Sequence, residues 1–413
     1  MTQDALNLIL ALGQSCLAII ATFIAVNQRR EQKYDMRVEN LRKIIKSIRV
    51  ERYYYARQSL KYYQERFKDD PEVRVDQVIY RKGWVQDKDD PYFIPLDQIS
   101  LNLRDGSQPD WQTADNPQPN FLPTPRDGYA ENAKFHCDIN LMNLPLYGLG
   151  GVRLTGVGGD KRLALDIIKG HYYDFYDTCE VLSAEMADHR RIRREPDLMK
   201  ARLPLRDKTS DLFDLTNRFA GIGVNALTII HNVRDGKGKK GSYFLLHKRS
   251  GNVAEGIGNY HVVPAGSYQP ATVEFPERVE EIDRNLNFTV VRELGEELLG
   301  EEEFSDLFSS ELVTAYRKIP AAELIGIGFD PLNTKTEIMA CLTLDAETTN
   351  LFGGKTTAEE IQDQLTSTYE GQVSLKELTR PMIRQFRDNP MSIPAFRQIL
   401  TVVLEHGQRF GVR

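Results

Sequence analysis

The chain has 413 residues, of which 41% are hydrophobic and 27% are charged, a composition typical of globular protein and not of a disordered chain. It is long enough for two or three domains with cores of their own. Its four cysteines show no CxxC or CxxH spacing, which argues against a zinc site and a disulfide framework and fits a reducing compartment. The net charge is −6, but residues 27–66 hold twelve Lys or Arg against five Asp or Glu, a local +7 that leaves −13 for the rest.

An apolar segment near the N-terminus predicts a transmembrane anchor in residues 1–26. Ala5 to Val26 contains no charged residue, and about 20 apolar residues cross the hydrocarbon core of a bilayer as a helix. Asp4 precedes this segment, whereas Arg29 and Arg30 follow it. The positive-inside rule therefore predicts a single-pass membrane protein with its N-terminus outside and the bulk of the chain cytoplasmic. The alternative is a buried or interfacial helix.

The basic segment that follows, residues 27–70, predicts an amphipathic or coiled helix. Its apolar residues repeat at a spacing of three and four, interrupted by Arg52: Val38, Leu41, Ile45, Ile48 and Tyr55. Such a seam is typical of a short coiled coil, which would make a homo-oligomer, or of a helix docked on a neighbouring element. The basic residues off the seam are expected to contact membrane lipid. Nucleic acid, the competing partner, is not expected directly after a membrane span.

Residues 71–210 predict a mixed middle region whose role the sequence does not reveal. Residues 73–80 and 91–103 are expected to form short strands, and residues 105–125 a long loop. The glycine-rich residues 148–159 lack the GK[ST] ending of a phosphate-binding loop, so we expect a hairpin or turn there. Apolar residues at three-four spacing predict a helix over residues 163–199.

The C-terminal half predicts an α/β (α+β) fold, a mixed sheet flanked by helices over residues 211–350. Strands are expected on both sides of one acidic helix, at residues 221–231, 243–249, 260–263, 324–329 and 337–344. From Thr357 the pattern is again helical, and residues 351–413 are interpreted as a helical extension. Ser392 and Pro394 are expected to cap its last helix, residues 396–406.

The acidic helix, Phe288 to Gly300, carries the residues that point to chemistry. At 100° per residue Glu293, Glu296 and Glu297 fall on one face. The roughly opposite face is apolar: Val291, Leu294 and Leu298. Like charges at this spacing destabilise a helix by about a few tenths of a kcal/mol per pair, which a bound cation such as Mg²⁺ or Mn²⁺ reverses. The alternative is a solvated acidic face.

The same residues resemble a family motif. Arg292, Glu293, Leu294, Glu296 and Glu297 have the order and spacing of the REUxEE core of the Nudix box, in which U is an aliphatic residue. The region that is similar to Nudix hydrolases covers residues 211–347. The longer run from residue 203 also resembles a divergent Nudix-like branch that occurs fused to other modules in bacteria, many of them labelled regulators.

The resemblance implies a metal site and a reaction. Glu293, Glu296 and Glu297 would bind Mg²⁺ or Mn²⁺, and Arg292 would orient their carboxylates. Glu293, Arg292 and Glu297 would be the catalytic residues, with Glu293 binding metal or helping to deprotonate water. The substrate would be a nucleotide diphosphate-type small molecule. Glu337, in a later strand, is a candidate for an additional carboxylate, and an exposed strand residue is the alternative.

Three features depart from the family pattern. The Gly and the first Glu of the box are expected fourteen and eight residues before the box Arg, where this chain has Arg278 and Arg284. Gly266 and Glu274 are interpreted as their displaced counterparts. The Gly that usually follows the double Glu arrives one residue late, at Gly300.

These patterns lead to three hypotheses for the function. The first is a membrane-anchored cytoplasmic protein that binds and hydrolyses a nucleoside diphosphate linked to another group. The second is a Nudix-like nucleotide sensor or regulator that signals through its membrane-attached region. The altered glycine and glutamate positions favour the sensor, whereas retention of all three glutamates favours catalysis. The third is an oligomeric membrane effector that damages the bilayer when it binds a signal.

Overall fold

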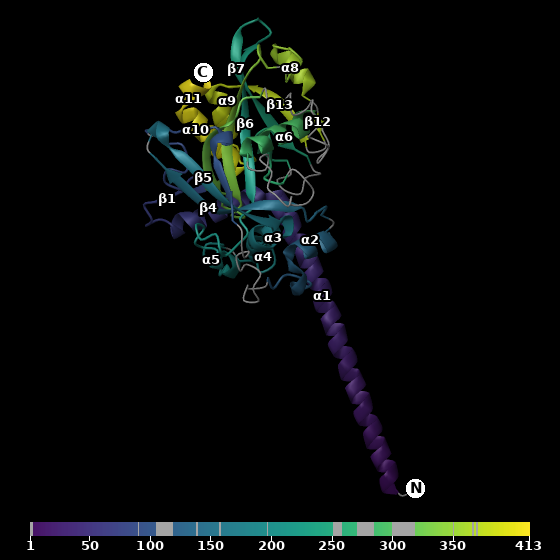
Figure 1. Cartoon of the computed structure of the whole chain (residues 1–413). Helices are drawn as coiled ribbons and strands as arrows, with labels where there is room; N and C mark the ends of the chain where they lie inside the picture. The colour runs from purple at the N-terminus through teal and green to yellow at the C-terminus, as the bar shows by residue number, and fades with distance from the viewer. Residues whose placement is uncertain are drawn as a thin grey trace.

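The computed structural model describes residues 3–104, 119–250, 258–270, 285–299 and 319–413, apart from the single positions 90, 138, 157, 196, 350, 366, 369 and 370. The side chains of residues 3–16, 299, 367 and 368 are also outside this description. Helix α1 (Gln3–Arg66) opens the fold. Its N-terminal half projects from the body of the protein, and its C-terminal half packs into it (Figure 1).

The seam expected in α1 is buried against the body. Leu41, Ile45, Ile48 and Tyr55 are each less than a tenth exposed and belong to one core cluster with helices α2 (Gly128–Cys137) and α4 (Val181–Arg191). The seam is therefore docked on neighbouring elements of the same chain. The helix has a non-helical residue at Glu51, with φ −121° and ψ 24°.

The projecting arm, residues 3–36 of α1, contains the expected membrane span. Among its described side chains, eight large hydrophobic residues are exposed: Leu17, Ile19, Ile20, Phe23, Ile24, Val26, Tyr34 and Met36. Within the described part of the chain, no helix is both long enough and apolar enough to cross a membrane. The anchor is therefore not supported by the described residues. The side chains of residues 5–16, more than half of the expected span, lie outside them.

A ten-stranded mixed sheet is the centre of the body, as the sequence predicts for the fold class. Its main path runs β1-β2-β10-β11-β6-β7-β13-β12, with β8 paired to β7 and β9 paired to β6. β6 and β11 are parallel, and the other pairs are antiparallel. The bounds are β1 Val73–Val75, β2 Ile79–Arg81, β6 Ile222–Arg234, β7 Lys240–Arg249, β8 Tyr260–His261, β9 Ala265–Ser267, β10 Glu323–Phe329, β11 Thr336–Asp345, β12 Ser367–Thr368 and β13 Gly371–Glu377.

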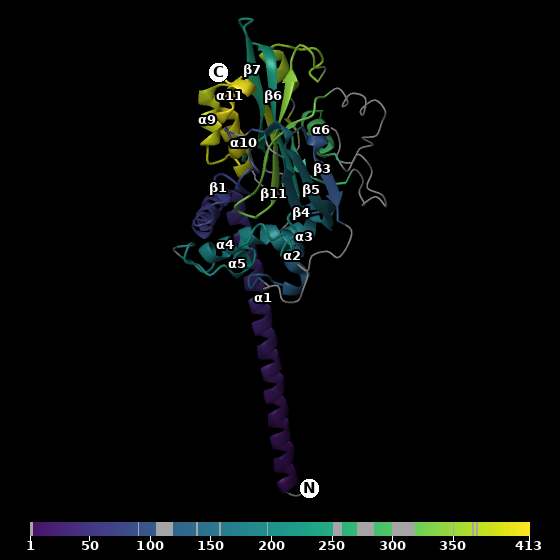
Figure 2. The same ribbon diagram turned by 60° about the vertical axis from the view of Figure 1, so that its left-hand side comes forward.

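Two layers cover this sheet because its strands alternate apolar residues between both faces. On one face Ala226 and Ile230 of β6 share a core with α6 (Leu286–Leu299) and a smaller sheet. On the other face Leu227 and Ile229 pack with α9 (Arg380–Arg387), α10 (Pro394–Glu405) and α11 (Gly407–Phe410). Figure 2 shows the two layers on either side of the strands. The remaining C-terminal helix is α8 (Ala358–Gln364).

The smaller sheet, in the order β3-β5-β4, corrects part of the predicted middle region. Its strands are β3 Ser100–Leu103, β4 Pro145–Thr155 and β5 Arg162–His171. The helix predicted from residue 163 is therefore wrong for its first nine residues, because Leu163, Leu165 and Ile167 alternate with period two and bury one face of β5. The glycine-rich segment lies mostly in strand β4, and only its end forms the turn into β5.

Short helices connect these strands. They are η1 Leu96–Gln98, η3 Pro125–Asp127, η4 Gly158–Asp160, α3 Tyr172–Phe175, the π-helical η5 Tyr176–Glu180 and α5 Pro204–Lys208. The main sheet takes strands from both sides of the predicted boundary at residue 210, because β2 pairs with β10 through Ile79 and Phe329. It also extends past residue 350, where β13 pairs with β7 in a segment expected to be helical.

Candidate functional site

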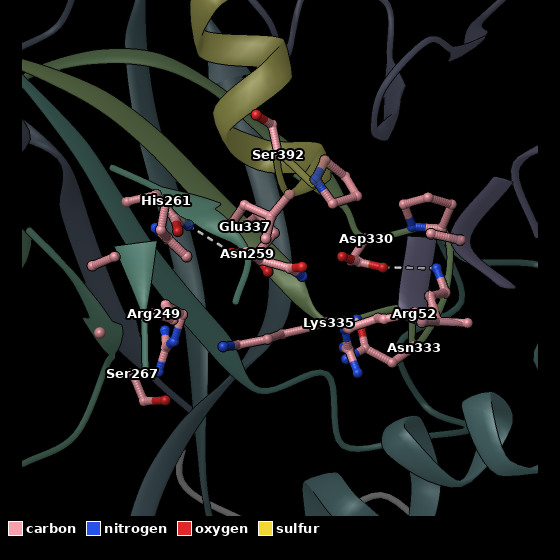
Figure 3. Close-up of a pocket in the computed structure, with 18 of the residues that line it drawn as sticks. Arg52, Arg249, Asn259, His261, Ser267, Asp330, Asn333, Lys335, Glu337 and Ser392 are labelled. Atoms are coloured by element: carbon pink, nitrogen blue, oxygen red, sulfur yellow. Dashed lines mark hydrogen bonds between the residues drawn. The ribbon is translucent and has the colours of Figure 1, made fainter. Parts of the chain in front are cut away.

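A cavity of about 630 Å³ lies where strand β6 changes its partner. The first residues of β6, Gly223 to Asn225, pair with β9, whereas residues from Ile229 onward pair with β7. Between the two pairings, Ala226 N and Thr228 N donate to the carbonyls of Pro264 and Val263. The described lining comes from α1, β6, the end of β7, β8, β9, α6, the β10–β11 loop, β11 and the start of α10, and also from the β1–β2 loop, the loop between α2 and β4, and α3 (Figure 3).

Helix α6 brings its acidic face to this cavity and buries its apolar face, as predicted. Val291, Leu294 and Leu298 are at most 5% exposed. The side chains of Glu293 and Glu296 line the cavity with exposed fractions of 13% and 18%. The solvated-face alternative is therefore wrong for this helix. Carboxylates at such low exposure need compensating cations or hydrogen bonds.

Arg292 provides part of that compensation. Its side chain is 5% exposed, and its Nη2 donates to Glu293 Oε1 at 2.7 Å and to the carbonyl of Ser267 at 3.2 Å. Its Nε lies 3.8 Å from Glu296 Oε1, the i,i+4 position on the helix. Arg292 thus holds Glu293 against strand β9. The orienting role that the sequence motif implies for Arg292 stays a prediction.

Gly266 of β9 makes room for Glu293. A Cβ atom built on Gly266 would lie 1.9 Å from Glu293 Cδ and about as close to both carboxylate oxygens. No side chain fits at this position unless Glu293 moves. The displaced family glycine proposed from the sequence is therefore in contact with the helix glutamate, although it lies too early in the chain for the family spacing.

Glu337 of β11, the strand that pairs with β6, lines the same cavity. It is 7% exposed, so the exposed-strand alternative is wrong. Asn225 Nδ2 donates to Glu337 Oε2 at 2.6 Å. Glu337 pairs with Gly223 across the parallel β11–β6 ladder, and a Cβ on Gly223 would lie 2.8 Å from Glu337 Oε2. A second glycine thus makes room for a second carboxylate.

Glu297 does not join the other glutamates. It is 3% exposed, it is absent from the described lining of the cavity, and its Oε1 lies 3.7 Å from Nδ1 of the buried His247. Within the described part of the chain, no group of three or more His, Cys, Asp or Glu side chains is arranged to hold a metal ion. The described carboxylates that line the cavity are those of Glu293, Glu296, Glu337 and Asp330.

Basic residues that the sequence reading missed line the cavity beside these acids. Arg249 ends β7 and Lys335 precedes β11, and in Figure 3 both extend into the space around Glu337. Burial holds the pKa of His261 well below its ordinary value of 6.5, and the positive charges of Arg249 and of Lys335 lower it further. His261 is therefore neutral at pH 7. In the sequence, the feature that could have identified Arg249 and Lys335 is their position beside the ends of predicted strands.

The remaining wall comes from the two ends of the chain and from the middle region, which contributes Asn140, Met142 and Tyr172 among others. Arg52, Tyr53 and Arg57 of α1 line the cavity, as do Ser392 and Arg397 around the start of α10. Periodicity identified these residues only as parts of helices, because nothing in the local sequence shows which surfaces meet. The proposed counterparts Glu274 and Gly300, and the two departures from the box pattern, Arg278 and Arg284, lie outside the described residues.

Among the solved structures that the chain is similar to is one distant neighbour from a bacterium. The crystal structure of a mutT/nudix family protein from Listeria innocua aligns with a TM-score of 0.26 and 15% sequence identity, covering 46% of this chain and 94% of that chain. No family model matches the chain, and no curated protein matches it. A likeness this weak establishes neither family nor activity.

The site combines two kinds of group that serve phosphate chemistry. Glu293, Glu296 and Glu337 offer the oxygen ligands that Mg²⁺ prefers, and Mg²⁺ commonly uses one or two carboxylates together with substrate phosphates instead of a complete protein cage. Arg249 and Lys335 offer positive charge for the phosphates themselves. The donor types therefore fit the metal that the motif implies.

Proposed function

We propose that the chain binds a nucleoside diphosphate linked to another group in this cavity and hydrolyses the diphosphate with the help of Mg²⁺ or Mn²⁺. The observation that carries the proposal is the convergence of Glu293, Glu296 and Glu337 with Arg249 and Lys335 on one cavity. Its volume of about 630 Å³ falls in the usual range for small-molecule sites. The Nudix-like motif on α6 supplies the reaction class.

Each group has a proposed role. Arg249 and Lys335 bind the diphosphate oxygens. Glu293, held by Arg292 and by the space above Gly266, accepts a proton from the attacking water. Glu296 and Glu337 would hold the divalent cation, which neutralises diphosphate charge and lowers the pKa of bound water. Glu297 supports α6 from inside through His247.

The experiment that tests this proposal follows binding and product together. The full chain is titrated with a panel of nucleoside diphosphates linked to a sugar or a second nucleoside, with and without Mg²⁺. We expect at least one member to bind only with Mg²⁺ and to yield two phosphate-containing or nucleoside-containing products. If no nucleotide of the panel binds, the proposal is wrong.

A nucleotide sensor is the second candidate, favoured by helix α1. The residues of α1 that line the cavity, Arg52, Tyr53 and Arg57, lie directly after the non-helical Glu51 and on the same helix as the projecting arm. A ligand in the cavity therefore contacts an element that extends out of the body. As a sensor, the protein would bind the nucleotide without hydrolysing it, and binding would change the conformation of α1.

The projecting arm is proposed to attach the protein to a membrane, with the body on the cytoplasmic side. Exposed Leu17, Ile20, Phe23 and Ile24 support this, because apolar side chains in water are costly and a lipid environment removes that cost. A homo-oligomer built by the same side chains is the alternative that the arm supports.

A further inference from the structure

A second cationic region lies in the cavity away from the glutamates. Arg57 of α1 and Arg397 of α10 both line it. Burial lowers the pKa of Arg397 most; Tyr53 and Asp388 raise it, and the positive charges of Arg387 and Arg57 lower it again, so Arg57 lies near enough to act on Arg397. Like charges held together in this way are stabilised when an anion lies between them.

The described acids near this pair are already engaged. Asp388 forms two bonds with Arg387, Nε to Oδ1 at 2.7 Å and Nη2 to Oδ2 at 3.0 Å. Arg397 Nε donates to the carbonyl of Arg387 at 2.7 Å, which fixes its direction. In the described part of the chain, neither Arg57 nor Arg397 forms an ion pair with a carboxylate. Their charges are therefore available to a ligand.

The start of α10 adds neutral donors at the same place. This helix of 12 residues has Ile393 at its N-cap and no side-chain capping bond, and Ile393 and Pro394 line the cavity. Pro394 has no N–H, and Ile393 N donates to the carbonyl of Tyr260, so the backbone donors of the first turn are the N–H groups of Ala395 and Phe396. Ser392 is 4% exposed, and its Oγ has no hydrogen-bond partner among the described residues. An uncapped helix N-terminus with a buried hydroxyl beside it favours an anion that accepts several hydrogen bonds.

Backbone pairing fixes this corner. Tyr260 N donates to the carbonyl of Met391 at 2.8 Å, and Ile393 N donates to the carbonyl of Tyr260 at 3.2 Å, so β8 holds both sides of Ser392. In the view of Figure 3, Ser392 lies apart from Arg249, with Glu337 and Asn259 between them. The corner is therefore distinct from the cations that serve the diphosphate.

We propose that Arg57, Arg397 and Ser392, with the N-terminus of α10, form a second phosphate subsite in the cavity. The ligand class that follows is a nucleotide bearing a phosphate group separate from the diphosphate held beside the glutamates. This ligand class rests on the proposed function, whereas the subsite itself rests only on the geometry at the start of α10.

Two inorganic probes test the subsite without knowledge of the natural ligand. Inorganic phosphate is titrated into the full chain by calorimetry without Mg²⁺, and imidodiphosphate with Mg²⁺ is titrated separately and again in the presence of phosphate. We expect both probes to bind together. Arg57→Gln and Arg397→Gln should each weaken phosphate binding by about tenfold or more, because each removes a charged donor, and should leave imidodiphosphate binding unchanged.

Arg384→Gln is the matched control, because Arg384 is an exposed arginine of α9 outside the described cavity lining. Arg57 is also exposed, so its variant tests the subsite even where the Arg397 variant unfolds. No binding of phosphate to the wild-type chain, unchanged phosphate affinity in both variants, or mutual exclusion of the two probes would overturn the subsite. If the wild-type chain binds phosphate but does not bind imidodiphosphate with Mg²⁺, the proposed function is overturned and the phosphate subsite stands.

Discussion

Gly266 and Glu293 occupy one space: a Cβ on the glycine would lie 1.9 Å from Cδ of the glutamate. The glycine belongs to β9 and the glutamate to α6, so the approach of strand and helix sets the position of the carboxylate. Arg292 then bonds both partners, through Glu293 Oε1 and the carbonyl of Ser267. The position of Glu293 thus depends on three contacts and not on the helix alone.

Gly266→Ala should therefore displace Glu293 from Arg292 and reduce Mg²⁺-dependent turnover by about tenfold or more, because the proton acceptor moves out of its position. The measurement is product release by the variant with the tightest-binding nucleotide of the panel. Gly236→Ala is the control, since a Cβ on Gly236 meets no atom within 4 Å. Equal turnover by both variants would show that Glu293 does not need its observed position.

The adjacent glutamates should respond differently to the same change. Glu296→Gln should weaken Mg²⁺ binding with little loss of stability, because Glu296 lines the cavity. Glu297→Gln should lower the free energy of unfolding by roughly 1–3 kcal/mol, because it replaces the buried carboxylate beside His247 with a neutral amide. Calorimetry with Mg²⁺ and urea unfolding separate the two effects. A larger loss of Mg²⁺ affinity in the Glu297 variant would restore the metal ligand set that the motif implied.

How much of this could be read from the sequence depends on the range of the interactions. Helix α6 follows from local periodicity, and so do β6, β7, β10 and β11, because each buries a face that its own residues define. Glu337 looked exposed because its burial depends on Gly223, which lies more than a hundred residues earlier and meets it only through the parallel β11–β6 ladder. Glu296 and Glu297 are neighbours on one helical face, and only the position of His247 separates their surroundings.

The errors have similar physical causes. Strand β5 was predicted as a helix because its apolar residues continue into a true helix, and period two over a few positions is a weak signal. The walls supplied by α1 and α10 are contacts between the two ends of the chain. No local pattern predicts them, because register and docking depend on the complete sheet.

Because the apolar seam of α1 packs against the body, a substitution in the seam should destabilise the protein strongly. Leu41→Ala should lower the free energy of unfolding by about 2–5 kcal/mol, because Leu41 is fully buried and its loss leaves a cavity. Val50→Ala on the same helix should change it by less than about 0.5 kcal/mol, because Val50 is 74% exposed. Urea unfolding measures both. Similar values for the two variants would mean that α1 does not dock as observed.

The projecting arm gives a prediction for membranes. The full chain should resist extraction by alkaline carbonate, whereas a chain that begins at Tyr34 should appear in the soluble fraction, because the arm carries the exposed apolar residues. Both chains keep the docked part of α1, so folding of the body is matched. Release of the full chain by carbonate would rule out the attachment.

The neutral His261 predicts a dependence of stability on pH. Its folded-state pKa lies well below 6.5, so below that pH the unfolded chain takes up a proton that the folded chain does not. The free energy of unfolding should fall as pH decreases below 6.5, with a slope that approaches about 1.4 kcal/mol per pH unit from this residue. His261→Asn should remove that share of the slope. Urea unfolding from pH 5 to 8 compares the two proteins, and identical slopes would contradict the assignment.

The most direct test of the cavity as a hydrolytic site is turnover of the tightest-binding nucleoside diphosphate of the panel by the wild-type chain and by Glu293→Gln, with Mg²⁺. We predict steady product release by the wild type and a loss of orders of magnitude in turnover for the variant, with a much smaller change in ligand affinity, because Glu293 acts on charge that develops in the transition state. Tight Mg²⁺-dependent binding to the wild type without any product over hours, at neutral and alkaline pH, would contradict the hydrolase and leave the sensor.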